Sequence, residues 1–172
     1  MSRILRLVFL AVLAGGLSAC FTSKTLLIAP DAAVFPHERI DFRVVDGDGT
    51  LQRLERAGDS YRLTPDPESD RFGLVRLKAA GADTFVVQFW SVPEGGDTDT
   101  QVLYALLVAD PAGKRIASYA SVKPDAFAPL PGLVPCGENV CIEDLEAYVA
   151  YARALVAAGA PPDQVYEIVA TR

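Results

Sequence analysis

Apolar and polar residues alternate with a period of two along several segments between residues 25 and 122. Ile40, Phe42 and Val44, for example, alternate with Asp41 and Arg43. This alternation is typical of a strand that buries one face, and glycine, proline and aspartate separate the segments. The chain therefore predicts short strands at residues 25–29, 40–44, 50–56, 61–64, 71–78, 83–90, 101–109 and 114–122.

The connections between these segments are typical of hairpins. Residues 46–49 read Asp-Gly-Asp-Gly, which is a strong hairpin signal. Residues 110–113 suit a turn, because proline stands second and glycine fourth. Residues 101–109 are apolar on both faces, which favours a central strand that is covered on both sides.

The spacing of the apolar residues changes after a proline-rich passage. Residues from about 142 to 158 predict a helix. Its apolar residues recur at helical spacing, acids stand in its first turn, and Gly159 with two prolines ends it. Residues 164–170 then predict a final strand. The fold class is α+β and mainly β: an antiparallel meander sheet or partial barrel of about seven to eight short strands, with one C-terminal helix packed on it.

Residues 1–20 carry a different pattern. Arg3 and Arg6 precede an apolar run at residues 7–13, and residues 17–20 read Leu-Ser-Ala-Cys. The run is shorter than the roughly 20 residues that span a membrane. With small residues before the cysteine, it is typical of a cleaved export signal. Residues 17–20 resemble the lipobox of bacterial lipoproteins.

This resemblance implies that residues 1–19 are removed and that Cys20 becomes an N-terminus carrying diacylglycerol and palmitate. The lipid would be the protein's attachment to a membrane of the cell envelope. Phe21, not aspartate, follows the cysteine, which implies the periplasmic face of the outer membrane if the host is Gram-negative. The alternatives are an ordinary secretory signal that contains a cysteine, and a retained anchor helix.

Length and net charge limit the number of domains and the kind of partner. The chain from Cys20 to Arg172 has 153 residues, enough for one domain with its own core. We expect residues 20–24 to form a lipidated tether and residues 25–172 a single β-rich periplasmic domain. The signal holds two of the sixteen basic residues and none of the twenty-two acidic ones, so the mature net charge is −8. That charge argues against nucleic acid as a partner.

Two cysteines remain once Cys20 carries lipid. Cys136 and Cys141 stand five positions apart, and in an oxidising envelope the simplest prediction is a disulfide between them. The alternative, a zinc site, needs more ligands than this pair supplies. The single histidine, His37, stands about a hundred positions away. We therefore expect a disulfide, and neither a metal nor another cofactor.

Residues 44–55 partly match an EF-hand calcium loop, with acids at loop positions three and five, glycine at six and glutamate at twelve. Position one is Val44, and the preceding residues alternate like a strand, so a hairpin turn is the better interpretation. The paired carboxylates of the chain stand in turns or at the helix start, where solvation or capping explains them. No nucleophile elbow, phosphate loop or positioned partner for His37 is evident. We therefore expect no catalytic residues.

Three aromatic residues are candidates for a binding surface. Trp90 stands on the strand face opposite Phe85 and Phe89, which we expect in the core. Tyr148 and Tyr151 flank the apolar stripe of the helix. An aromatic side chain beside a loop or on a helix surface is a plausible anchor for a partner. Burial in the core is the alternative for all three.

The sequence favours a non-catalytic accessory or scaffold lipoprotein that binds an envelope protein partner. The alternative is a ligand-binding or enzyme-inhibiting β-domain. It resembles small lysozyme-inhibitor lipoproteins in its anchor, β architecture and disulfide, but shares no inhibitory motif with them. A third hypothesis is a hydrolase built from scattered acids. An exposed apolar patch would support the scaffold, an apolar pocket the ligand binder, and a cleft of acids with displaced pKa values the hydrolase.

Overall fold

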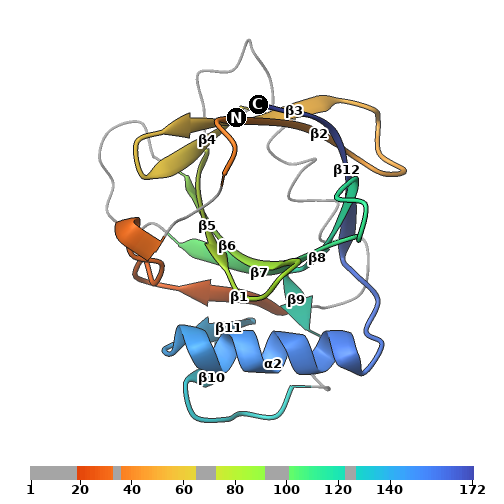
Figure 1. Cartoon of the computed structure of the whole chain (residues 1–172). Helices are drawn as coiled ribbons and strands as arrows, with labels where there is room; N and C mark the ends of the chain where they lie inside the picture. Colours follow the sequence, from red (N-terminus) through yellow and green to blue (C-terminus); the bar gives the residue numbers. More distant parts are fainter. Residues whose placement is uncertain (1–18, 33–35, 65–72, 92–100, 123–126) are drawn as a thin grey trace.

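The computed structural model describes residues 19–32, 36–64, 73–91, 101–122 and 127–172. Eight strands close into an antiparallel barrel, and further strands and the helix lie outside it (Figure 1). The predicted fold class, mainly β with a C-terminal helix, is confirmed. The barrel strands in order are β2 (Arg39–Val44), β3 (Leu51–Ala57), β4 (Ser60–Thr64), β5 (Gly73–Ala79), β6 (Thr84–Ser91), β7 (Val102–Ala109), β8 (Arg115–Tyr119) and β12 (Gln164–Thr171).

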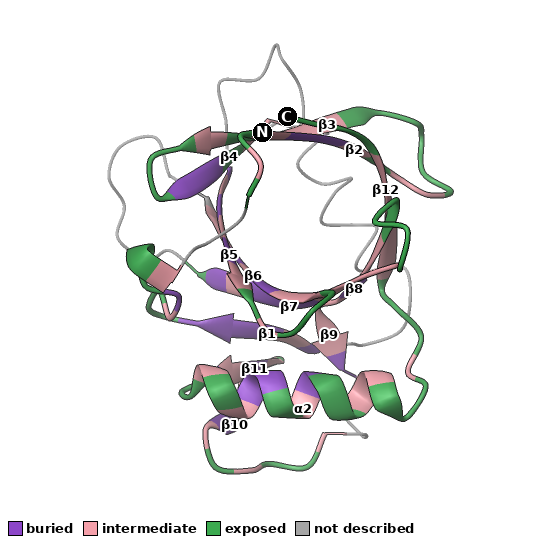
Figure 2. Cartoon of the chain, viewed as in Figure 1, coloured by how far each residue is buried: buried purple, intermediate pink, exposed green. Residues whose placement is uncertain are grey.

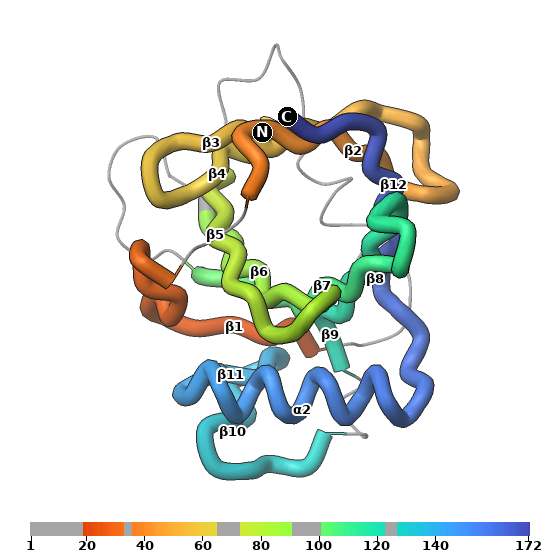
Figure 3. The backbone as a smooth tube through the Cα atoms, viewed as in Figure 1, coloured from red at the N-terminus to blue at the C-terminus, as the bar shows by residue number. Residues whose placement is uncertain are grey.

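Strand β12 closes the barrel, because it pairs with β2 on one side and with β8 on the other (Figure 3). Tyr166 stands opposite Val44 of β2 and Ile116 of β8. The pairing with β2 shifts register between Ile168 and Ala170, an irregularity of the β-bulge kind. Bulges bend a strand and increase its twist, so this irregularity helps the last strand to meet the first.

The turn between β2 and β3 is the predicted hairpin. Asp46 and Gly49 have positive φ values of 62° and 81°, a conformation that aspartate tolerates and glycine adopts freely. The Thr50 amide donates to Asp48 Oδ1 at 2.9 Å, which closes the turn locally. Residues 44–55 therefore run from strand to turn to strand, and the helical frame of an EF-hand does not form there.

A second layer lies against the outer face of β6 and β7 (Figure 1). Strand β1 (Ala19–Ser23) pairs antiparallel with the first half of β7 and parallel with β11 (Asn139–Ile142). Strands β9 (Ser121–Val122) and β10 (Leu133–Cys136) extend this layer. The helix α2 (Leu145–Ala157) packs against it. A short 3-10 helix, η1 (Pro30–Ala32), precedes β2.

The predicted helix is confirmed, but it starts later than expected. Asp144 caps it, because its side chain accepts a hydrogen bond from the Glu146 amide at 2.9 Å. The helix ends at Ala157, one residue before the predicted end. At the other end the chain up to Ile142 belongs to β11. The apolar Ile142 fits the helical spacing by chance, since it contributes to the same core from a strand.

The tether predicted at residues 20–24 is wrong, because most of it is β1. Cys20 pairs with Ser121 of β9, Phe21 is 1% exposed, and the ring of Phe21 lies 4.9 Å from that of Tyr148 on α2. Exposing a fully buried phenylalanine costs roughly 1.5–3 kcal/mol, so this segment does not act as a flexible link. The folded body therefore includes the residue that the lipobox predicts as the mature N-terminus.

The strand predicted at residues 25–29 is also wrong. Polar side chains on the outer face of β6 and β7 hold this segment. The Leu27 amide donates to the Tyr104 hydroxyl at 3.0 Å, and the Ile28 amide donates to Gln88 Oε1 at 2.8 Å. These side chains satisfy backbone groups that a neighbouring strand would otherwise satisfy. The apolar run therefore buries Ile28 without forming a strand.

Apolar side chains pack on both faces of β6 and β7, in two separate clusters. This confirms residues 101–109 as a strand that is covered on both sides. Buried residues also lie on β1 and α2, shown in purple below the barrel in Figure 2. The outer cluster joins the barrel to β1, β11 and α2, and its buried members include Phe21, Ile28, Val86, Val102, Tyr104, Leu106, Leu133, Val140, Ile142, Tyr148 and Val149. The inner cluster lies inside the barrel and comprises Leu54, Tyr61, Leu63, Val75, Leu77, Phe85, Val87, Phe89 and Leu107.

Candidate functional site

The inner cluster belongs to the apolar lining of the barrel interior, which we call the lumen wall. Residues opposite each other on paired strands project to the same side of a sheet, so the register assigns the faces. Val75 of β5, for example, stands opposite Tyr61 of β4 and Phe89 of β6. Followed around the barrel, this rule gives an apolar lumen wall that includes Ile40, Phe42, Val44, Leu54, Tyr61, Leu63, Val75, Leu77, Phe85, Val87, Phe89, Leu103, Ala105, Leu107, Ile116, Tyr166 and Ile168. The same rule places the polar side chains of Gln52, Arg56, Ser118 and Gln164 on this face.

Much of the lumen wall is less buried than the outer cluster. On β6, Val86 and Gln88 point outward and are 0% exposed. Phe85, Val87 and Phe89 point into the lumen and are only partly buried. Apolar side chains in a filled core are close-packed and shielded from water. The side chains of the barrel therefore leave part of their own apolar lining accessible.

A charged group lies at one end of this lining. Arg56 stands opposite Tyr61, its guanidinium lies 5.1 Å from the ring centroid, and it donates to the Tyr61 hydroxyl at 2.8 Å. The same guanidinium donates to the carbonyl of His37 at 3.3 Å and forms an ion pair with Glu38 at 3.0 Å. Burial raises the pKa of Tyr61, which keeps its hydroxyl protonated to donate to the His37 carbonyl.

Further polar atoms of the lining occur on β12 and β8. The ring of Tyr166 contacts that of Phe42 edge-on, with centroids 5.5 Å apart. Burial raises the pKa of Tyr166, and its hydroxyl shares a hydrogen bond with the side chain of Ser118, which is 5% exposed. Rings, aliphatic side chains and a few hydroxyl groups therefore line the lumen, a composition that suits a small apolar molecule.

The aromatic residues singled out from the sequence lie elsewhere. Trp90 is on the outer face of β6, packs against the outer cluster, and lies beneath the Arg76 guanidinium at 5.5 Å. Tyr148 is 0% exposed, and Tyr151 is partly buried with its ring 5.9 Å from that of Phe21. All three therefore contribute to the outer cluster, and none belongs to the lumen wall. The acidic loop at 92–100 lies outside the described residues.

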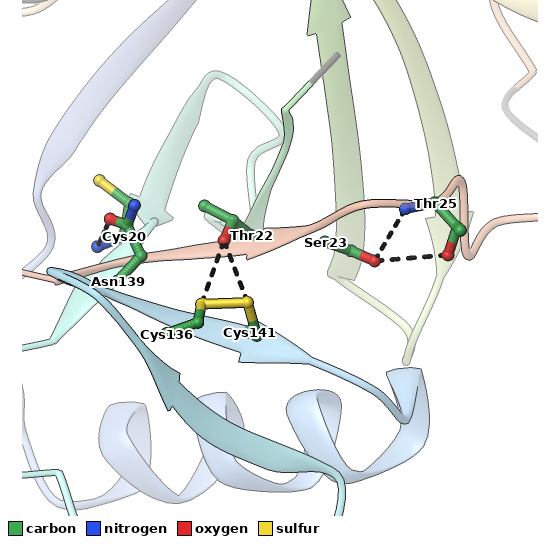
Figure 4. The surroundings of a disulfide bond; sticks show 7 residues. All are labelled: Cys20, Thr22, Ser23, Thr25, Cys136, Asn139 and Cys141. Carbon is green, nitrogen blue, oxygen red and sulfur yellow. Dashed lines mark hydrogen bonds between the residues drawn. A yellow bond between two sulfur atoms is a disulfide. The ribbon is translucent and has the colours of Figure 1, made fainter. Parts of the chain in front are cut away.

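The predicted disulfide is confirmed, with 2.09 Å between the sulfur atoms of Cys136 and Cys141 (Figure 4). It links β10 to β11, and Thr22 Oγ1 of β1 lies 3.9 and 4.0 Å from the two sulfur atoms. Cys20 is a free, partly buried thiol, and burial raises its pKa. Residues 1–18, which include Leu17 and Ser18 of the lipobox-like sequence, lie outside the described residues.

Two depressions border the described barrel strands. One of about 600 Å³ lies between the β2–β3 turn and the segment before β12, and its lining combines Val44, Val45 and Val165 with Asp46, Arg115 and Asp163. The other, of about 180 Å³, lies between β5 and α2, where Lys78 and Glu146 form an ion pair at 2.8 Å. Charged side chains contribute to both linings, whereas the inner cluster of the barrel is apolar apart from the Tyr61 hydroxyl.

Carboxylates with displaced pKa values do not converge on one place. The Arg39 side chain lowers the pKa of Asp41 on the outer face of β2, and the Ser60 hydroxyl lowers that of Asp59 in the β3–β4 turn. Across the described ranges, no group of three His, Cys, Asp or Glu residues is placed to hold a metal ion. Each displaced carboxylate is explained by its own local donors.

Comparisons with known proteins leave the function to be inferred from the molecule itself. No protein-family model, curated protein or solved structure matches the chain. Within the described part of the chain, the helices are too short or too polar to cross a membrane. The lumen wall and the lipobox are therefore the two features on which an inference of function rests.

Proposed function

We propose that the protein is a lipid-anchored, non-catalytic component of the cell envelope that binds a small apolar molecule inside its barrel. The observation that carries the proposal is a contrast within β6: the outward side chains of Val86 and Gln88 are completely buried, whereas Phe85, Val87 and Phe89 in the lumen are only partly buried. An eight-stranded barrel is wide enough either to be filled by its own side chains or to hold one small ligand. Incomplete burial favours the second case.

The chemistry of the lumen wall defines the ligand class. Removing apolar surface from water contributes roughly 25 cal/mol per Å², so a ligand that covers the exposed parts of the wall gains affinity from its apolar area. The polar groups of the lining, those of Arg56, Tyr61 and Tyr166, already have hydrogen-bond partners within the protein. We therefore expect a mainly hydrocarbon or aromatic molecule with few polar groups.

The scaffold hypothesis has less support from the described surface. Its exposed large apolar side chains are Leu26, Leu51 and Val169. They belong to three different elements, the segment after β1, strand β3 and strand β12. A docking surface for a protein partner would instead bring several apolar side chains into one patch.

The test is to isolate the lipidated protein from its own envelope and identify bound small molecules by native and denaturing mass spectrometry. We expect one class of apolar compound at near-stoichiometric amounts. Val87→Trp and Leu107→Trp, which fill the lumen, should abolish its retention. Val169→Trp makes the same kind of change at a side chain that is 53% exposed, so it should leave retention unchanged.

Circular dichroism and an intact disulfide would confirm that each variant is folded. Ligand retention that is equal in the lumen variants and the Val169→Trp control would contradict the proposal. A protein that co-purifies in stoichiometric amount, while no small molecule is found, would favour the scaffold hypothesis.

A further inference from the structure

The predicted lipid attachment site is part of the sheet itself. Cys20 is the second residue of β1, pairs with Ser121 of β9, and its amide donates to Asn139 Oδ1 at 3.3 Å. The next amide, that of Phe21, donates to the carbonyl of Ala120 at 3.3 Å. No free chain separates the cysteine from the folded body. Figure 4 shows the Cys20 thiol beside Asn139 and pointing away from the disulfide.

We propose that the lipid on Cys20 holds one corner of the molecule directly against the bilayer. This corner, the anchor surface, consists of Cys20, Ser121 and the β10–β11 turn at residues 137–139. The partner is a lipid surface, and the inference rests on the lipid anchor of the proposed function. An extended chain spans at most about 3.5 Å per residue, so a free tether of residues 21–24 would let the domain stand off by about 14 Å. The β1 strand removes that distance.

Buried contacts keep β1 in place. The ring of Phe21 packs 4.9 Å from that of Tyr148 and 5.9 Å from that of Tyr151 on α2. Thr22 is 3% exposed and pairs with Cys141 in the parallel ladder with β11. Pulling β1 out to serve as a tether would expose Phe21 and break pairing with β7, β9 and β11 at once. The attachment point is therefore rigid relative to the barrel.

The disulfide supports the same geometry. It closes the hairpin whose second strand, β11, pairs with β1, and Thr22 lies against both of its sulfur atoms. The turn of that hairpin contains the exposed Gly137 and Glu138, next to Asn139, which contacts Cys20. Of the five residues that define the anchor surface, only Glu138 is charged, so these five side chains do not attract anionic headgroups.

This geometry gives the molecule one side that faces the bilayer and another that faces away from it. Glu138 belongs to the anchor surface, whereas Glu55 is on β3, across the barrel from β1 (Figure 1). Both side chains are exposed. They therefore form a matched pair of glutamates for measuring which part of the protein meets lipid.

The test places the photo-crosslinking residue p-benzoylphenylalanine at position 138 or position 55 of the full lipoprotein, in vesicles of zwitterionic phospholipid. Intact mass first establishes that Cys20 carries lipid and that the disulfide is formed. We expect phospholipid adducts at position 138 in several-fold higher yield than at position 55. A flexible Gly/Ser segment of about 20 residues inserted after Cys20, with a reach of about 25 Å, should reduce the yield at position 138 to that at position 55.

Each outcome has one meaning. Equal yields at positions 138 and 55 in the lipidated protein would overturn the anchor surface and leave the lipid anchor standing. A yield at position 138 that survives the insertion would also overturn it, because a tethered domain has no fixed side toward the bilayer. A mature protein without lipid on Cys20 would overturn the anchor of the proposed function, and the anchor surface with it.

Discussion

Replacing Asp41 by asparagine should remove a stabilising charge cluster near the seam where the barrel closes. Asp41 is 6% exposed and accepts hydrogen bonds from Arg39 Nη2 at 2.6 Å and from Arg53 Nε at 2.8 Å. Hydrogen bonds from Arg39 and then Arg53 lower the pKa of the Asp41 carboxyl from 3.8 to about 2. The cluster joins β2 to β3, and Asp41 stands opposite Ala170 at the irregular pairing with β12.

The lowered pKa of Asp41 indicates how much its charge contributes to the free energy of folding. The difference between 3.8 and about 2 corresponds to roughly 2.4 kcal/mol of folding free energy, at about 1.36 kcal/mol for each tenfold change in proton affinity. The side chains of Arg39 and Arg53 are 25% and 38% exposed, so solvent screens part of this energy. We therefore expect D41N to lower the free energy of unfolding by about 1–2 kcal/mol at pH 7.

Urea unfolding at two pH values tests the electrostatic origin of this energy. Because the folded state lowers the pKa, the stabilisation is complete above the unfolded pKa of about 4 and is lost as the pH falls toward 2. The difference between wild type and D41N should therefore shrink by about half at pH 3. E167Q is the control, since its partner Arg43 is 51% exposed and the pair should contribute less than about 0.5 kcal/mol. An equal D41N effect at both pH values would refute the reasoning.

Three further changes probe other parts of the structure. Replacing Cys136 and Cys141 by serine should lower the free energy of unfolding by roughly 2 kcal/mol, measured in urea without reductant, because the disulfide closes a short loop; no change would mean that the loop is equally constrained without it. Gly73→Ala should lower the free energy of unfolding by about 1–3 kcal/mol, measured by thermal unfolding, because the new Cβ would lie 2.1 Å from Phe89 Cε2. Adding Phe89→Leu to the Gly73→Ala variant should recover part of this stability, because it removes the clashing ring. Burial raises the pKa of Tyr104 to about 12, so its ionisation should lower the free energy of unfolding as the pH rises above about 10. Because burial also raises the pKa of other tyrosines, Tyr104→Phe should make this alkaline decrease smaller without abolishing it, and it should cost about 1–2 kcal/mol of stability at pH 7; an unchanged alkaline profile in urea unfolding would contradict the prediction.

Most barrel strands could be predicted because alternation is a local signal. Strands β6 and β7 begin and end within one residue of the predicted segments 83–90 and 101–109. The β10–β11 hairpin was missed, because Pro135 interrupts β10 and proline within a run argues against a strand. The strand predicted at 114–122 is interrupted at Ala120, where the chain leaves β8 for β9. Closure of the barrel depends on β12 meeting both β2 and β8, which no local pattern reports.

The candidate site was harder to predict than the fold. Phe85 and Phe89 were expected in the core. An apolar face has the same sequence pattern whether it packs against other side chains or lines an accessible interior. Trp90 was a candidate because it stands on the strand face opposite Phe85 and Phe89, next to a loop, yet the Arg76 guanidinium lies over it on the outer face. The sequence also could not reveal that Cys20 stands inside a strand, because β1 depends on partners from β7, β9 and β11.

The two clusters on opposite faces of β6 and β7 contribute differently to the structure. The outer cluster joins the barrel to β1, β11 and α2, whereas the inner cluster consists of barrel side chains alone. A substitution at Val86 or Leu106 therefore disturbs the contact between the two layers, whereas one at Phe85, Val87 or Leu107 changes the interior of the barrel. The residues that shape the interior and the residues that hold the outer layer can therefore vary independently along the same two strands.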